Sequence, residues 1–351
     1  MRRLSVSCRW RFLSLAIALS LAGCSSVSYY SQLATGQLAL LRAREPIAQV
    51  ISDPARDAAL RKRLAHAQQA RDFASTQLQL PDNQSYRLYA ELGRPYVVWN
   101  VFATAEFSLD PVTHCFPIAG CVAYRGYYRL GAARGAAAVQ RQAGKDVYLS
   151  GVEAYSTLGW FDDPILSSMT HWGDERLATL IFHELAHQRF YVKDDTAFNE
   201  SFASFVEQEG TRQWRTARGL APEPLSQSAR RDQFIQLVLD TRERLQAMYR
   251  QPLAAEAMRA RKAAEFERLR HDYRQLRDTQ WAGDKRFDGW INSPMNNAKL
   301  LPFGLYDQWV PAFEALFKQV GGDWQAFYKA VEKLGNQPEE TRKVALKGLM
   351  K

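Results

Sequence analysis

The feature that most constrains the fold of this 351-residue chain is an uninterrupted stretch, residues 174–193, that contains His183-Glu184-Leu185-Ala186-His187. No Pro or Gly occurs in it, acidic residues open it, and apolar residues recur at helical spacing at Leu177, Leu180, Ile181 and Leu185. Two histidines four residues apart lie one above the other on a helix, so both imidazoles can bind one metal ion. The stretch therefore predicts a helix with one buried face and one metal-binding face.

The pentapeptide is an HExxH motif, the signature of zinc peptidases, in which an acid lies between two metal ligands. Glu184 is about one step round the helix from His183, where it would not bind the metal. It could instead take a proton from water at the metal and later pass that proton to a leaving amine. The bare pentapeptide also fits two ordinary histidines on a partly buried helix, so the interpretation depends on a third ligand.

Glu200 is the candidate for this third ligand, because a catalytic zinc site has three protein ligands and an open fourth position. Twelve residues separate Glu200 from His187, enough for a turn and a reversal of the chain. An apolar stripe predicts a second helix packed beside the first, with its members at Phe198, Phe202 and Phe205. We predict a Zn²⁺ site of His183, His187 and Glu200; the alternative for Glu200 is a solvated carboxylate.

HExxH followed by Asn199-Glu200 resembles the gluzincins, zinc peptidases with HExxH on one helix and a Glu ligand on the next. In that family an acid often follows the ligand Glu by four residues. Here that position is Ser204, so the group that orients a ligand histidine is not identified. Glu207 and Glu209, further along the same helix, are weaker substitutes for the third ligand and are expected to face solvent. The resemblance also implies that a strand before the HExxH helix lines the cleft and pairs with an extended substrate.

The first half of the chain predicts helices over 26–43, 54–79 and 125–142, and strands over 86–92, 95–107, 146–150 and 152–158. Tyr155, in the last of these strands, is the candidate to hold substrate or to help stabilise an oxyanion. The alternative for Tyr155 is a half-buried structural residue. Trp160 and Phe161, in the turn that follows, are expected to pack in the core rather than to line the pocket.

The N-terminus predicts export and lipidation. Four arginines precede an apolar run, residues 12–22, that is too short to span a membrane. The run ends in Leu21-Ala22-Gly23-Cys24, which resembles a bacterial lipobox, so residues 1–23 are predicted to be a signal peptide and Cys24 the lipidated first residue. The alternative is a signal anchor with an incidental Cys. Acyl chains on Cys24 would hold the protein on a lipid bilayer. Ser25 follows the lipidated position, and by resemblance to lipoproteins without Asp at that position the protein is expected at the outer membrane, facing the periplasm.

Charge and cysteines narrow the remaining classes of function. The formal charge of +9 falls to +5 without the signal peptide, and no Arg/Lys cluster with interleaved aromatics stands out, so no nucleic-acid partner is expected. Cys115 and Cys121 are the cysteines left after Cys8 and Cys24, and an oxidising compartment favours a disulfide between them. A metal site with His114 is the alternative. The sequence does not predict an oligomeric state.

The last third of the chain predicts a helical hairpin over 227–282, with helices over 227–251 and 253–281 that meet near Pro252. A solvated face is the plain interpretation of its charges, and a membrane-facing or partner-binding hairpin is the alternative. Beyond it, Asn297 and Tyr306 are candidates to reach the cleft and bind substrate. A helix cap and a core Tyr would explain the same two residues.

The lipobox, HELAHQ, Asn199-Glu200 and the Asn296-Asn297-Ala298 block together resemble a bacterial family of predicted aminopeptidase lipoproteins, over nearly the whole mature chain. The resemblance implies a peptide substrate and a zinc aminopeptidase. We predict an α+β, predominantly α-helical fold, with residues 24–351 forming one zincin-like domain with a small β-sheet and extra C-terminal helices. The alternatives are a zinc endopeptidase or amidase of the envelope, and a noncatalytic lipoprotein that binds a partner.

Overall fold

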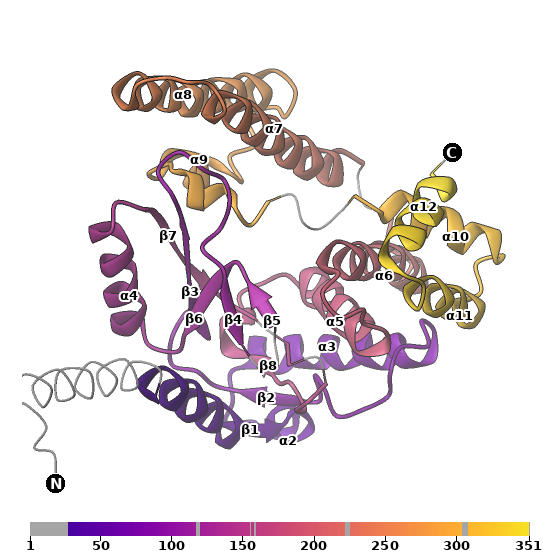
Figure 1. Ribbon diagram of the computed structural model, residues 1–351. Coiled ribbons are helices and arrows are strands. Elements are labelled where there is room, and N and C mark those ends of the chain that lie inside the picture. The colour runs from indigo at the N-terminus through magenta and orange to yellow at the C-terminus, as the bar shows by residue number, and fades with distance from the viewer. Residues whose placement is uncertain are drawn as a thin grey trace, which may run out of the picture.

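The computed structural model describes residues 27–116, 120–154, 156–157, 159–221, 225–303 and 308–350. The chain is α+β and about 59% helical, with small sheets, which confirms the predicted class at that level (Figure 1). Among these residues no helix is long and apolar enough to cross a membrane. The predicted signal peptide and Cys24 lie outside the described residues.

Among the described residues, the strands lie in the first half of the chain. A helix over residues 27–42 is followed by β1 (Arg44–Pro46), α2 (Ile47–Ser52), α3 (Ala58–Thr76), β2 (Leu88–Ala90), β3 (Val98–Thr104), β4 (His114–Phe116), β5 (Gly120–Val122), β6 (Tyr124–Tyr127), α4 (Leu130–Gln142), β7 (Asp146–Val152) and β8 (Ile165–Leu166).

The second half is helical. It contains η1 (Ser167–Met169), α5 (Asp174–Arg189), α6 (Thr196–Ala217), α7 (Leu225–Tyr249), α8 (Ala255–Thr279), α9 (Asp288–Asn292), η2 (Asn297–Leu300), α10 (Val310–Gln319), α11 (Trp324–Gly335) and α12 (Glu339–Leu349). The expected hairpin corresponds to α7 and α8, which pack against each other.

Two predictions about strands are wrong. The predicted helix over 125–142 begins five residues later, at Leu130, because residues 124–127 form β6 and pair with β3. The predicted break at Gly151 does not occur: β7 runs through this residue, since the ring of Tyr96 fills the space of the missing side chain, 2.5 Å from where a Cβ would lie. The strand then ends at Val152, so the predicted strand over 152–158 is absent from the described residues of that segment.

The strands form three small sheets, ordered β1-β2-β8, β6-β3-β7 and β4-β5. In the second sheet, successive side chains of β3 point to opposite faces. Val101 and Ala103 pack against Ala133 and Ala137 of α4, whereas Phe102 packs against Ala298 and Leu301 on the other face. Both faces of this sheet are therefore covered, one by α4 and one by the segment around η2.

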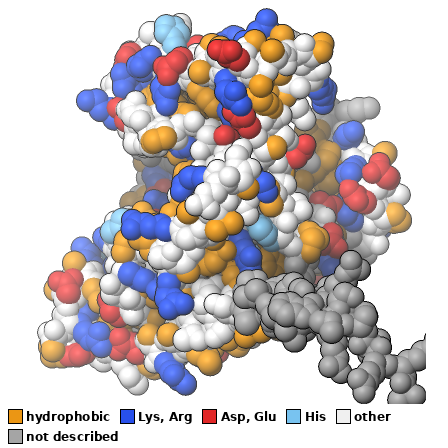
Figure 2. All heavy atoms as spheres, turned by 60° about the vertical axis from the view of Figure 1, so that its left-hand side comes forward, with side chains coloured by type: hydrophobic (Ala, Val, Ile, Leu, Met, Phe, Trp, Pro, Cys, Tyr) orange, Lys and Arg blue, Asp and Glu red, His pale blue; other side chains and the backbone are white. Residues whose placement is uncertain are grey.

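The main core lies among helices. It includes α3, α5, α6 and the C-terminal helices α10–α12, with aromatic side chains from α6 meeting those of α10 and α11. The α7–α8 hairpin has a second core of its own with α9. Lys262 of α8 fastens the hairpin to β7 through Asp146 at 2.6 Å. Figure 2 shows Lys and Arg side chains interspersed with Asp and Glu on the upper part of the molecule, where the hairpin lies.

Candidate metal centre

Helix α5 presents the two predicted histidine ligands from its less buried side. Leu177, Ile181 and Leu185 are 0% exposed and fix the opposite side of the helix in the main core. Asp174 and Glu175 occupy the first turn, where carboxylates interact favourably with the helix dipole. His183 and His187, one turn apart, consequently point together toward α6, and their rings are 4.8 Å apart between centroids.

Helix α6 presents Glu200 from its second turn. Asp195 caps the helix by accepting a hydrogen bond from the backbone N–H of Phe198 at 3.0 Å. The buried side chain of Asn199 donates to the carbonyl of Val192 and accepts from its N–H, both at 2.7 Å. This pair of bonds fixes the short loop between α5 and α6. The Asn of the Asn-Glu pair therefore sets the reversal that brings Glu200 to the histidines.

The three predicted ligands form a compact triangle. The Nε2 atoms of His183 and His187 are 3.2 Å apart, and the Oε2 atom of Glu200 lies 3.5 Å from the first and 3.7 Å from the second. Ligand atoms at 2.0–2.1 Å from a zinc ion, at tetrahedral angles, are about 3.3 Å apart. The triangle matches this spacing, so the donor atoms fit three corners of a tetrahedral site. Among the described residues, this is the group of His, Cys, Asp and Glu side chains that could hold a metal ion.

The pKa values of His183 and Glu200 are shifted by the short distances between the charged side chains. Burial alone would lower the pKa of His183, but hydrogen bonds with Glu200 and Glu207 raise it to about 10. Burial would likewise raise the pKa of Glu200, but His183 and His187 lower it to about 2. Without a metal ion the site is therefore held by ion pairs, and a metal must displace a proton from His183 to bind.

Glu207 is the orienting acid that the sequence did not identify. Its Oε2 atom accepts a hydrogen bond from Nδ1 of His183 at 2.8 Å, and its side chain is only 17% exposed. The prediction that it faces solvent is wrong, because residues 200 and 207 are two helical turns apart and share a face. Ser204 is buried on the same helix. Glu209 pairs with Arg212 instead, so it is not freely solvated either.

Glu184 faces a buried group of polar side chains. The pKa of Tyr86 is raised well above its usual range by burial first and then by the charges of Glu184 and Asp163. Burial, together with the charge of Glu184, also raises the pKa of Asp163 to about 6, against hydrogen bonds that lower it. Tyr86 has a left-handed backbone, with φ of 64°, and its N–H donates to the carbonyl of Asp163 at 2.6 Å. This cluster was not recognised in the sequence, where no pattern links residue 86 to residue 184.

The segment between β7 and β8 lies beside this cluster. Tyr155 is outside the described residues, whereas its neighbours Ser156 and Thr157 both donate hydrogen bonds to the Asp163 carboxylate. Trp160 and Phe161 are 73% and 45% exposed, so the expectation that they pack in the core is wrong. The turn that holds them is fixed by its own hydrogen bonds and needs no packing of the rings.

Asn297 does not reach the cleft. It is 0% exposed, its amide donates to the carbonyls of Glu106 and Ser108, and its carbonyl oxygen accepts from the hydroxyl of Tyr249. These bonds occupy both amide hydrogens, which gives Asn297 a structural role and contradicts the expectation that it binds substrate. Tyr306 lies outside the described residues.

Cys115 and Cys121 form a disulfide across the β4–β5 hairpin, where the two residues are paired. The hairpin extends toward the metal centre: a Cβ at Gly120 would lie 3.1 Å from Oδ1 of Asp194, in the loop after α5. The pKa of Tyr124, at the start of β6, is raised by burial and then by the charge of Glu200. Tyr191 lies on the same side, with its ring 6.1 Å from that of His187. Neither tyrosine belongs to a motif, so only the fold places them here.

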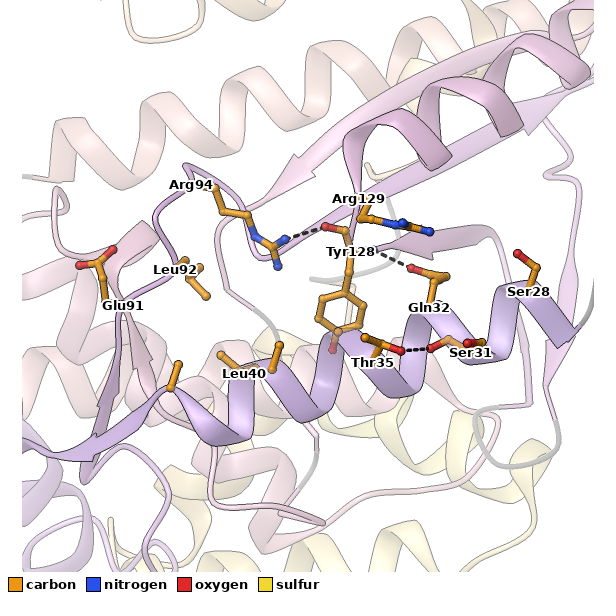
Figure 3. A pocket seen from close by; sticks show the side chains of 13 residues that line it. Ser28, Ser31, Gln32, Thr35, Leu40, Glu91, Leu92, Arg94, Tyr128 and Arg129 are labelled. Atoms are coloured by element: carbon orange, nitrogen blue, oxygen red, sulfur yellow. Dashed lines mark hydrogen bonds between the residues drawn. The ribbon is translucent and has the colours of Figure 1, made fainter.

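A separate cavity of about 540 Å³ lies between the helix over residues 27–42 and the junction of β6 with α4 (Figure 3). Gln32 of the helix accepts from the N–H of Tyr128, and Arg94 donates to the carbonyl of the same residue, so the helix and the loop before β3 are both bonded to Tyr128. None of the predicted metal ligands lines this cavity. The cavity and the candidate metal centre are therefore separate features of the fold.

The fold and this cluster define the protein as an α+β chain with an HExxH helix facing a Glu-bearing helix. A family model described as "Putative aminopeptidase" matches residues 28–346, and the chain belongs to this family. At this coarse level the protein is a peptidase with a peptide substrate. No curated protein and no solved structure matches the chain.

Proposed function

We propose that the protein is a zinc-dependent aminopeptidase of the gluzincin type, with a zincin-like core, and that it works in the bacterial envelope as a lipoprotein anchored through Cys24. The observation that carries the zinc assignment is the triangle of two Nε2 atoms and one carboxylate oxygen, with sides of 3.2, 3.5 and 3.7 Å. Family membership supports the aminopeptidase activity. The lipobox-like Leu21-Ala22-Gly23-Cys24 supports the anchor, and Ser25 after it supports the outer-membrane location.

His183, His187 and Glu200 would hold the metal, which supplies Lewis-acid polarisation of the scissile carbonyl and a lowered pKa of water. Glu207 orients His183 through the hydrogen bond from Nδ1, which leaves Nε2 as the atom that would bind the metal. Glu184 is adjacent to His183 on the helix but outside the triangle, so its carboxylate is free to accept a proton from water and to return it to the leaving amine.

The substitution Glu184→Gln tests this proposal. It removes the base and keeps the size of the side chain, so hydrolysis of aminoacyl substrates should fall by about 10²-fold or more, as expected for loss of general acid–base catalysis. Zinc content should remain that of the wild type because Glu184 is not a ligand. The matched control is Glu209→Gln on α6, whose carboxylate pairs with Arg212. If the Glu184 variant keeps full activity, the mechanism is wrong.

The choice of substrate separates the aminopeptidase from an endopeptidase. Aminoacyl and free-N-terminal peptides should be cleaved, and the same peptides with an acetylated N-terminus should not. Cleavage confined to acetylated or internally quenched peptides would replace the aminopeptidase by an endopeptidase. Membrane fractionation of wild type and Cys24→Ala tests the anchor, because only the wild type should be found with membranes.

A further inference from the structure

Two neighbouring aromatic side chains are exposed in a turn that packs against α5. Trp160 is 73% exposed and Phe161 is 45% exposed, and both belong to the turn between β7 and β8. Exposed large apolar residues that occur together commonly mark a binding surface.

Hydrogen bonds hold the turn in one conformation. The N–H of Trp160 donates to the carbonyl of Thr157 at 3.1 Å, and the N–H of Phe161 donates to the hydroxyl of the same residue at 3.1 Å. Thr157 is fixed in turn by Asp163, which accepts from its N–H at 2.8 Å and from its hydroxyl at 2.9 Å. Asp163 is 4% exposed and therefore an interior anchor. The aromatic pair is thus presented by a preorganised turn, which lowers the entropic cost of binding.

The turn lies on the Glu184 side of the metal centre. Gly159 has φ of 82°, and a Cβ there would lie 3.4 Å from the side chain of Gln188. Gln188 is one helical turn beyond Glu184, so the two share a face of α5. Asp163 interacts electrostatically with Glu184, which places the other end of the turn beside the same residue. The turn that carries Trp160 and Phe161 therefore lies along the face of α5 to which Glu184 belongs.

We propose that Trp160 and Phe161 form a subsite for a large apolar side chain, so that the enzyme prefers peptides with a Leu-like or Phe-like residue beside the scissile bond. This inference rests on the proposed peptidase function. The rings offer apolar faces, and the Asp163 carboxylate behind them is occupied by the turn and is not available to select a basic side chain. An apolar side chain that covers these faces loses contact with water, which is favourable.

The test compares Trp160→Ala and Phe161→Ala with wild type on two peptide series, X-Ala-Ala-Ala and Ala-X-Ala-Ala, where X is Leu, Phe, Ala or Arg. The kcat/KM for Leu and Phe peptides in one series should fall about tenfold, the effect of losing one good apolar contact, and that for Ala peptides less than twofold. Trp160→Phe should keep most of the preference. Tyr30→Ala, which truncates a 47% exposed aromatic on the helix over 27–42, is the matched control and should change nothing.

Several results would overturn the subsite. One is an equal loss for all X, a second is no loss, and a third is a wild-type preference for Arg peptides. A fourth is unchanged selectivity together with lost binding to phosphatidylethanolamine–phosphatidylglycerol vesicles, which would make the pair a membrane contact. The failure of the subsite is distinguishable from that of the proposed function. If only the subsite is wrong, wild type hydrolyses peptides and Glu184→Gln abolishes this activity. If the proposed function is wrong, wild type itself hydrolyses no peptide. Zinc content checks that each variant is folded at the site.

Discussion

The most specific prediction concerns Glu207, whose contact with His183 is not predicted from any motif. Replacing it by Gln removes the carboxylate that accepts the Nδ1 hydrogen of His183 at 2.8 Å and keeps the size of the side chain. The partner is a metal ligand and the bond is shielded, since the Glu207 side chain is 17% exposed. A hydrogen bond to a charged group contributes about 1.5–3 kcal/mol. We therefore expect zinc affinity to fall about 10- to 100-fold, the range typical of such orienting acids.

The assay is competition for zinc against a chromophoric chelator, with kcat/KM measured in excess zinc. Glu209→Gln is the control, because Glu209 lies on the same helix and bonds to Arg212 and Gln213 rather than to a histidine. It should bind zinc as the wild type does. If Glu207→Gln binds zinc within twofold of this control, Glu207 does not orient His183 and the reasoning is refuted.

Three further variants test the surroundings of the site. Asp163 binds a proton more tightly in the folded than in the unfolded state, because its pKa is raised from 3.8 to about 6. Protonation therefore stabilises the fold, so the unfolding free energy of wild type relative to Asp163→Asn should fall by about 2 kcal/mol from pH 4 to 7.5 in urea titrations, whereas a flat difference would contradict this. Replacing Cys115 and Cys121 by Ser opens a loop with a sequence separation of 6 and should lower the unfolding free energy by about 2 kcal/mol in the same titration. An unchanged midpoint of urea unfolding would contradict this. A Cβ at Gly210 would lie 2.7 Å from Leu78 and 3.2 Å from Phe182, so Gly210→Ala should push α6 away from these side chains. The unfolding free energy should fall by about 1–3 kcal/mol and zinc binding should weaken, whereas a variant as stable as wild type would show that the neighbouring side chains can move aside.

Local patterns carried the prediction of the metal centre. HExxH needs only the helical repeat to bring two imidazoles together, and the apolar stripe of α6 places Glu200 on a second helix. Asn199 was noted as part of a motif, but its role in clamping Val192 depends on the loop geometry. Glu207 is expected to face solvent because a Glu on a helix usually does. Its seven-residue spacing from Glu200 puts both residues on the same face of α6, but only the fold shows that this face meets His183.

The parts that could not be predicted depend on contacts between distant segments. The predicted helix over 125–142 includes residues 125–127, but these residues form part of β6, because pairing with β3 overrides the local preference of this short segment. Tyr86 and Asp163 lie near Glu184 but far from each other in the sequence, with β2 to β7 and α4 between them, so no local pattern links the three residues. Trp160 and Phe161 were expected inside because aromatic residues usually are, whereas hydrogen bonds through Thr157 keep their turn at the surface. The expectation that Asn297 binds substrate depends on its residue type alone. The side chain is buried and hydrogen-bonded within the fold, which residue type does not show.

The most direct test of the central claim is the zinc content of the protein that begins at Ser25, measured by mass spectrometry of metals after dialysis. Wild type should retain about one zinc per chain, as expected for a site with three protein ligands. His183→Ala and Glu200→Ala, each of which removes one corner of the triangle, should retain far less, and Glu184→Gln should retain as much as wild type. Wild type without stoichiometric zinc, or a Glu200 variant that keeps it fully, would contradict the assignment of His183, His187 and Glu200 as the metal centre.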